Sequence, residues 1–319
     1  MSKDRTPDCN QNAGKVALIA GPTASGKSDL AVRLALALQD VGRGTVVINA
    51  DSAQVYADLR VLSARPSEED MRGVEHRLFG AWDGAEACSA AEWAEAAKGE
   101  IARAHHAGAV PILVGGTGLY IRTLLDGIAP VPPIHEAIRE AVRAMNPPQI
   151  YAALLEEDHG YALQLNCGDR QRTSRALEVV RSSGKSLKEW QKDKVGGVAD
   201  AITLAPLVLL PEREPLYARC DARFAAMMDQ GAPEEVEALL ARQIDPLLPV
   251  MCAIGVREIA GYLHGSWSRA EAIAMGQQAT RNYAKRQYTW LRHQPPADWP
   301  RLTPESVDLQ REFETLFRN

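Results

Sequence analysis

The sequence has no long hydrophobic run and few cysteines. No apolar stretch approaches the roughly 18 residues that a membrane-spanning helix needs, so we expect no membrane span. The five cysteines are scattered and form no C-x-x-C pair, which argues against a zinc site or a disulfide framework and suits a reducing cytoplasm. They are Cys9, Cys88, Cys167, Cys220 and Cys252. Residues 1–14 are polar and lack an apolar segment, which predicts a loose tail and no signal peptide.

An excess of positive charge is also missing. The chain carries 36 Lys and Arg against 41 Asp and Glu, a net charge of −5. Bulk charge therefore does not indicate a nucleic-acid partner, and such a partner would need local basic patches. With 319 residues and 46% hydrophobic content, the chain can form one large domain or two medium ones.

The segment GPTASGKS matches the phosphate-binding pattern G-x-x-x-x-G-K-[ST]. Apolar residues 16–20 before it predict a buried strand, and an apolar stripe in residues 29–39 predicts a helix after it. Backbone N–H groups and a helix N-terminus would bind phosphate oxygens, the lysine would add charge, and the last serine can hold Mg²⁺. The predicted phosphate-binding residues are Gly21, Pro22, Thr23, Ala24, Ser25, Gly26, Lys27 and Ser28. The motif does not tell which molecule carries the phosphates.

Strand and helix patterns alternate along most of the chain. Further strands are expected at 45–52, 110–114 and 202–210, and a helix at 88–107 begins with a Ser89–Glu92 capping box. This order predicts an α/β fold: a P-loop NTPase-like parallel sheet flanked by helices, with an α-helical insertion. The expected core comprises residues 15–128 and 200–319, in which helices dominate after the last strand. The insertion comprises residues 129–199.

The acidic residue that ATP-hydrolysing phosphate-loop proteins usually place at the end of a neighbouring strand is absent. The strand VPILV runs instead into Gly115-Gly116-Thr117. An acid follows the second predicted strand, at Asp51. Because the carboxyl ends of parallel strands line the ligand crevice, we expect Asp51 beside the phosphate loop. There it could assist a metal ion or accept a proton, although it could also simply cap the next turn with Ser52.

Two stretches are locally basic. Residues 169–194 hold eight Lys or Arg against four Asp or Glu, and residues 279–293 hold four Lys or Arg and no acid. The second stretch also interleaves Tyr283, Tyr288 and Trp290. Such segments can contact a nucleic-acid backbone and stack on bases, or they can be ordinary solvated helix faces.

The sequence resembles the tRNA dimethylallyltransferases. The resemblance rests on the ordered segments GPTASGKS, INADSAQVY, VGGTGLYIRTLL, RQRTSRALEV, CAIGVREI and AKRQYTWLR, and covers residues 15–293. It implies that the exocyclic amine of the adenosine next to the anticodon attacks dimethylallyl diphosphate and releases magnesium pyrophosphate. It implies two substrates, dimethylallyl diphosphate and the tRNA anticodon stem-loop, whose adenosine must be flipped out of the stack.

The resemblance also assigns roles to residues. Asp51 would be the general base, Thr117 would position the reacting nucleobase, and Arg223 would help the phosphate loop to hold the diphosphate. Ser28 and Asp51 are the predicted Mg²⁺ ligands, and the insertion would clamp the stem-loop. Together with the second basic stretch, the predicted tRNA contacts are Asp51, Ser52, Ala53, Gln54, Gln171, Arg172, Thr173, Ser174, Arg175, Met251, Cys252, Ala253, Ile254, Gly255, Val256, Arg257, Lys285 and Arg286.

Four places depart from the family pattern. Val74-Glu75-His76-Arg77 replaces Pro-His-His, Arg60–Arg65 replaces Asp-Ile-Gly-Thr-Ala-Lys, and His135 and Val256 replace a common Asp and Tyr. Two other classes remain open: a small-molecule or nucleotide kinase, and a non-catalytic RNA-binding protein. A kinase should not need the basic C-terminal stretch, and a vestigial binder should have lost Lys27 or Asp51. We expect a monomeric cytoplasmic enzyme.

Overall fold

The computed structural model describes residues 14–318, which fall into two compact units. One unit contains the chain through Leu124 and from Val198 onward, and the other contains Leu125–Gly197. The predicted N-terminal tail, apart from residue 14, and Cys9 lie outside the described residues. Among the described helices, none combines the length and the apolar character that crossing a bilayer requires.

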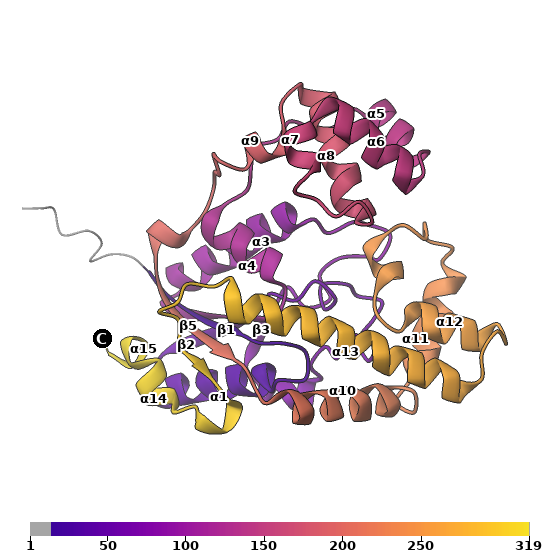
Figure 1. Ribbon diagram of the computed structural model, residues 1–319. Coiled ribbons are helices and arrows are strands. Elements are labelled where there is room, and N and C mark those ends of the chain that lie inside the picture. Colours follow the sequence, from indigo (N-terminus) through magenta and orange to yellow (C-terminus); the bar gives the residue numbers. More distant parts are fainter. Residues whose placement is uncertain (1–13, 319) are drawn as a thin grey trace, which may run out of the picture. The chain divides into compact units, whose positions relative to one another are not determined.

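A six-stranded sheet forms the centre of the first unit, with strand order β3-β2-β4-β1-β5-β6 (Figure 1). Every neighbouring pair runs parallel. The strands are β1 Gly14–Ala20, β2 Gly44–Asn49, β3 Glu75–Arg77, β4 Ala109–Gly115, β5 Ile202–Leu209 and β6 Arg301–Leu302. The α/β fold with a parallel sheet, predicted from the alternation of patterns, is confirmed.

Neither edge strand, β3 nor β6, was predicted from the sequence. β3 has three residues and β6 two, and neither is fully buried. The hydrophobic runs that identify buried strands are therefore absent from them. The second predicted strand also ends earlier than expected, at Asn49, so Asp51 lies in the turn that follows β2.

Helices cover both faces of this sheet (Figure 1). Ala17 and Ile19 of β1 share a buried cluster with Leu34 of α1 and with Phe313. Since side chains alternate along a strand, Leu18 points to the opposite face, where α3 lies. The helices of this unit are α1 Lys27–Asp40, α2 Glu68–Met71, α3 Ala90–His106, α4 Gly118–Asp126, η1 Ala199–Ala201, α10 Arg213–Met227, α11 Ala232–Ala241, η2 Pro249–Cys252, α12 Val256–Leu263, α13 Arg269–His293, η3 Pro304–Ser306, α14 Leu309–Glu312 and α15 Glu314–Phe317; the last residues of α4 belong to the second unit.

Helix α3 begins with the predicted capping box. The Ser89 side chain accepts a hydrogen bond from the Glu92 amide at 3.2 Å, and the Glu92 carboxylate accepts one from the Ser89 amide at 2.8 Å. The helix ends just before Gly108, whose φ of 70° suits glycine. These three residues are local signals that mark both ends of the helix.

Helix α13 is the longest in the described chain, at 25 residues. Its buried positions recur every three or four residues, which is the spacing of one helix face. They are Ala272, Gly276, Thr280, Ala284, Gln287 and Leu291. Gly276 is needed for close packing on α10, because a Cβ there would meet Phe224 Cζ at 1.9 Å. Lys285 and Arg286 remain on the exposed face.

The second unit is helical and has its own small core. Its helices are α5 Glu136–Arg143, α6 Pro147–Glu157, α7 His159–Ala162, α8 Arg170–Ser183 and α9 Leu187–Trp190. Val142, Ile150, Leu154 and Leu177 are buried together at its centre. The single backbone bridge, between Ile128 and Val195, ties the two ends of the segment together.

Candidate active site

A cavity of about 490 Å³ lies within the first unit, lined by segments that follow β1 and β2. This is where an open parallel sheet binds its ligands. Of the residues predicted for the site, those that line it are Thr23, Ala24, Ser25, Gly26, Lys27, Ser28, Asp51, Ser52, Ala53, Gln54, Arg223, Cys252, Ala253, Ile254 and Arg286. Segments separated by more than 200 residues thus contribute to one chamber.

The phosphate loop connects β1 to α1 through an unusual backbone. Ala24 and Gly26 have φ values of 60° and 86°, in the left-handed region. Such a conformation is costly for alanine and persists only where surrounding contacts hold it. Gly26 precedes the first turn of α1, whose N–H groups have no partner within the helix and can bind an anion.

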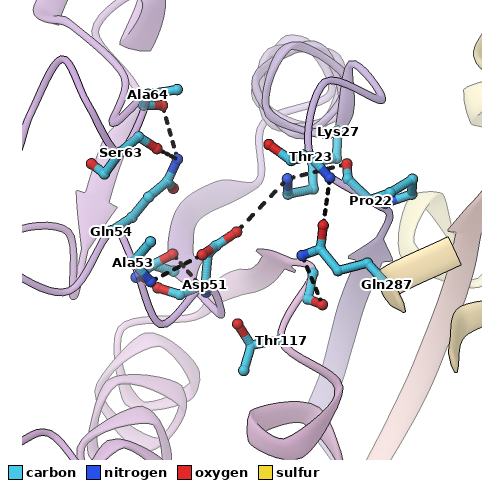
Figure 2. Close-up of polar contacts among 12 residues, drawn as sticks. Pro22, Thr23, Lys27, Asp51, Ala53, Gln54, Ser63, Ala64, Thr117 and Gln287 are labelled. Carbon is cyan, nitrogen blue, oxygen red and sulfur yellow. Dashed lines mark hydrogen bonds and ion pairs between the residues drawn. The ribbon is translucent and has the colours of Figure 1, made fainter. Parts of the chain in front are cut away.

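Lys27 and Asp51 face each other inside the cavity. Lys27 Nζ lies 4.0 Å from Asp51 Oδ2, and both side chains are less than a tenth exposed (Figure 2). Burial lowers the pKa of Lys27, and the negative charge of Asp51 opposes that shift. The site therefore places a basic and an acidic group close together and largely shielded from solvent.

The turn after β2 fixes the orientation of Asp51. The backbone amide of Asp51 donates to Asn49 Oδ1 at 2.9 Å, and Asp51 Oδ1 accepts from the Ala53 amide at 3.1 Å. Asn49 is fully buried, and its backbone carbonyl accepts a hydrogen bond from Trp93 Nε1 at 2.9 Å. Asp51 Oδ2 is left directed toward Lys27 (Figure 2).

Thr117 is joined to the turn that carries Asp51. Thr117 Oγ1 accepts from the Ser52 amide at 2.9 Å and donates to Ser52 Oγ at 3.2 Å. Burial raises the pKa of Tyr283, whose hydroxyl is near both residues and near Asp51. One carboxylate and three hydroxyls are therefore gathered together; Asp51, Ser52 and Tyr283 line the cavity, and Thr117 contacts it through Ser52.

The glycine pair at the end of β4 explains why no acid stands there. A Cβ at Gly115 would lie 2.1 Å from the carbonyl oxygen of Ala50, and one at Gly116 would lie 2.4 Å from Gln287 Nε2. Any side chain at these positions would push the neighbouring turn or α13 away. Close packing therefore requires glycine at both positions and leaves no room for an acidic side chain.

Helix α10 holds the phosphate loop from outside. Arg223 donates to Thr23 Oγ1, and Arg219 Nε donates to the carbonyl of Ala24 at 2.9 Å. Burial lowers the pKa of Arg223, while nearby Asp51 opposes the shift. Arg219 was not singled out in the sequence, because nothing local relates it to a loop 195 residues earlier.

Two buried polar groups stand out in or beside the phosphate loop. Ser25 Oγ has no hydrogen-bond partner among the described residues. Gln287, 5% exposed, donates to the carbonyl of Gly116 at 3.1 Å and accepts from the amide of Thr23 at 2.8 Å (Figure 2). In the sequence, Gln287 lies within a basic stretch, and no local pattern distinguishes it from its neighbours.

The remainder of the cavity wall is largely apolar. Leu62, Phe224, Met227 and the rings of Tyr56 and Tyr120 line it. Sequence patterns could not have found this wall, since its residues come from separate loops and helices. It can receive an apolar group attached to a phosphate-bound ligand.

The side chain of Gln54 forms hydrogen bonds within the protein. Its Nε2 donates to the carbonyls of Ser63 and Ala64 at 3.1 and 2.8 Å. The neighbouring loop is held from its other side by Glu235, whose carboxylate accepts the amides of residues 60–62 at 2.8–3.1 Å. Gln54 thus shapes the cavity wall by holding this loop, and its carboxamide nitrogen is not free for a ligand.

The other predicted tRNA contacts differ in exposure. On α8 of the second unit, Gln171, Arg172 and Arg175 are exposed and Ser174 is half-buried, whereas Thr173 is buried and donates within the helix. In the first unit, Arg257, Lys285 and Arg286 are exposed, Met251 is half-buried, and Gly255 and Val256 are buried. Val256 and Thr173 therefore do not present their side chains to a macromolecule.

Known proteins are similar to this chain over most of its length. Residues 54–294 match the family model described as IPP transferase. The chain belongs to the IPP transferase family. A tRNA dimethylallyltransferase of Erythrobacter litoralis is 65% identical over 314 residues, covering 98% of this chain and 99% of the relative. One of Novosphingobium aromaticivorans is 66% identical over 279 residues, covering 88% and 99%.

Solved structures of the family share the P-loop-like fold. A full-length tRNA isopentenylpyrophosphate transferase of Bacillus halodurans matches with a TM-score of 0.66 and 30% identity, covering 96% of this chain and 95% of that one. A eukaryotic dimethylallyltransferase described as acting on tRNA matches with a TM-score of 0.72 and 27% identity, covering 88% and 70%. The family's sheet and helices are therefore the frame of this site.

Proposed function

We propose that this protein transfers a dimethylallyl group from dimethylallyl diphosphate to the N6 amine of the tRNA adenosine 3′-adjacent to the anticodon. The carrying observation is the buried pair of Lys27 and Asp51, 4.0 Å apart, with the phosphate loop on one side and Thr117 on the other. Each member of the pair suits one substrate. Lys27 and the phosphate loop can bind a diphosphate, and the Asp51 carboxylate can accept a proton from an attacking amine.

The reaction needs one bond to form and one to break. The adenine N6 lone pair forms a bond to C1 of the prenyl group, and the C1–O bond breaks, so that diphosphate leaves with the electron pair. Asp51 accepts the proton that the amine loses. Lys27, the N-terminus of α1 and Arg223 stabilise the charge on the leaving diphosphate.

The cavity can accommodate the donor's two parts. Ser25 Oγ, buried and without a partner among the described residues, can donate to a diphosphate oxygen. The apolar wall of Leu62, Phe224 and Met227 can receive the prenyl tail. Neither feature reads a nucleobase, which favours a prenyl diphosphate over ATP.

Mg²⁺ fits the oxygen donors present. Ser28 and Asp51 supply a hydroxyl and a carboxylate, and residues 14–318 contain no group of three or more His, Cys, Asp or Glu that could form a complete cage. Magnesium commonly binds one or two protein oxygens and takes its other ligands from phosphates and water. When bound, it would neutralise charge on the diphosphate.

The acceptor adenosine would be flipped into the cavity from the anticodon stem-loop. Ser52 and Thr117 would position the base, and the exposed cations of α8 and α13 would contact phosphates. We also propose that the enzyme acts as a monomer. We place the reaction in the cytoplasm, where its tRNA substrate is found.

A donor-exchange experiment tests this function. The protein is incubated with tRNA and Mg²⁺ and with either dimethylallyl diphosphate or ATP, and nucleosides are analysed by mass spectrometry. We expect prenylated adenosine with the first donor only, inhibition by pyrophosphate and no turnover of ATP. Consumption of ATP in proportion to product would instead establish the kinase alternative.

A further inference from the structure

Gln287 joins two loops that follow neighbouring strands of the sheet, the phosphate loop after β1 and the glycine turn after β4. Its Oε1 accepts the Thr23 amide of the phosphate loop at 2.8 Å, and its Nε2 donates to the Gly116 carbonyl, beside Thr117, at 3.1 Å (Figure 2). These partners lie 264 and 171 residues away along the chain. Both ends of a single carboxamide are thus used, one on each loop.

A neutral carboxamide suits both contacts, because it carries a donor and an acceptor on one side chain. Gln287 is buried on α13, so its amide needs partners within the protein. Gly116 leaves it room, because a Cβ there would lie 2.4 Å from Gln287 Nε2. An apolar residue of the same length would fill the space, yet it would leave one amide and one carbonyl without partners.

The phosphate loop depends on outside contacts of this kind. Ala24, next to Thr23, has a left-handed φ of 60° that an alanine does not prefer. Arg219 holds the Ala24 carbonyl and Arg223 the Thr23 hydroxyl, both from α10. Gln287 is the contact from α13, and it is the one that also reaches the Thr117 turn.

We propose that Gln287 is a positioning residue that locks the phosphate loop to the Gly116–Thr117 turn. It sets the distance between the diphosphate and the acceptor base without contacting either of them. This inference rests on the proposed function, because it assigns a diphosphate to the loop. Gln287 also lies directly beside Lys285 and Arg286, so the helix that presents cations to RNA holds the donor loop from its buried face.

The first test replaces Gln287 by Met and measures binding of inorganic pyrophosphate with Mg²⁺ by calorimetry. If the phosphate loop is in its binding conformation in only a fraction of the molecules, the apparent affinity for pyrophosphate is lowered by that fraction. We expect affinity to fall by about tenfold, the effect of an unmade buried hydrogen bond. We expect tRNA affinity to change less than twofold. Gln277→Met is the matched control, because Gln277 lies on the same helix and donates to the Asp221 carbonyl, away from the loop.

The second test keeps the side-chain shape and uses pH. In Gln287→Glu, an ionised carboxylate can accept the Thr23 amide but cannot donate to the Gly116 carbonyl, whereas a protonated one can do both. Burial raises the pKa of such a carboxyl. We expect pyrophosphate affinity, relative to wild type, to recover as pH falls from 8 to 5.5. The charges around the cavity, Lys27, Asp51 and Arg223, and the ligand's own titration are common to both proteins and cancel in the ratio.

The outcomes separate the inference from the function on which it rests. Weak binding by Gln287→Met, normal binding by Gln277→Met and acid recovery of Gln287→Glu support the locking role. Wild-type affinity in Gln287→Met, or a pH-independent ratio in Gln287→Glu, would overturn it. If the wild-type protein itself did not bind pyrophosphate, the proposed function would fail. The assignment of a diphosphate to this loop would then fail as well.

Discussion

Lys27 and Asp51 have side chains that are 9% and 8% exposed, whereas Arg172 on α8 is 76% exposed and Arg175 45%. The first two lie beyond the carboxyl ends of β1 and β2, where turns and the N-terminus of α1 hold them. The arginines lie on a helix surface and pair only with acids one turn away, at 3.4 and 3.9 Å. Such exposed pairs add little to stability, so these side chains can exchange partners.

The difference matches two kinds of ligand. A diphosphate is small and highly charged, so it needs donors that are already in place and shielded from water. An RNA backbone presents many phosphates, and exposed cations bind it through release of counterions. The predictions below test whether the buried and the exposed charges divide the work in this way.

The largest effect is expected from Asp51→Asn. The amide keeps the shape of the carboxylate and can still accept the Ala53 amide, so fold and binding should survive. Single-turnover prenyl transfer should slow by about 100- to 10,000-fold, the usual range for losing a general acid or base. Asp229→Asn, at an exposed acid paired with Arg269, is the control and should react at the wild-type rate. A rate near wild type in Asp51→Asn would remove Asp51 from the mechanism.

Lys27→Met should act on binding of the donor. The substitution removes a buried charge beside the N-terminus of α1 and leaves the bound diphosphate without its lysine partner; truncating one partner of a buried charged pair across an interface costs roughly 100-fold or more in affinity. Calorimetric titration with pyrophosphate measures this loss, and tRNA affinity in a filter-binding assay should stay unchanged. A parallel loss of tRNA binding would show that the buried and exposed charges are not independent.

Cysteine alkylation gives a comparison without charge changes. Cys252 lines the cavity and is exposed, and Cys167 is exposed on the second unit. At a donor concentration ten times its Kd, about one tenth of sites stay free, so alkylation of Cys252 should slow roughly tenfold while that of Cys167 does not change. Peptide mass spectrometry follows each thiol. If the donor slowed alkylation of Cys252 and Cys167 equally, the protection would reflect a change in the whole protein and not a donor bound in the cavity.

The buried thiols supply a pH control in the same experiment. Burial raises the pKa of Cys88 and Cys220 above that of a free thiol. Since the thiolate is the reacting form, both should alkylate more slowly than Cys252 at pH 8 and gain rate as pH rises further.

The smallest effects are expected from single exposed cations. Arg172→Ala, Arg175→Ala, Lys285→Ala and Arg286→Ala should each weaken tRNA binding across sequences. Each should lower the salt dependence by about one counterion, so that the affinity lost between 50 and 200 mM salt becomes roughly threefold smaller. Pyrophosphate affinity is the control and should be unaffected. Unchanged tRNA binding in all four would place the RNA surface elsewhere.

Much of the fold followed from local pattern. The apolar runs of β1, β4 and β5 and the capping box of α3 are set by residues a few positions apart, so their prediction needed no tertiary information. The edge strand β3 did not follow. It contains only the polar residues Glu75, His76 and Arg77. Pairing with β2 places them in the sheet, which no periodicity could indicate.

The candidate site divides along the same line. The phosphate loop and Asp51 were recognisable because each follows an apolar strand directly. The tRNA residues remain a prediction, and the structure shows which of them can present a side chain. Val256 was proposed from its place in a motif, but α12 buries it. A motif gives the position of a residue along the chain, and packing decides which way the side chain points.

By itself the sequence determined the phosphate loop, the buried strands of the sheet and the acid that follows β2, because each is indicated by the residue pattern of one short segment. Only the tertiary structure decided how the loop is held. Thr23 is bound by Arg223 from 200 residues away and by Gln287 from 264 residues away. Contacts over such separations exist only after α10 and α13 have packed beside the loop. Their energy comes from burial and geometry, which no local pattern records.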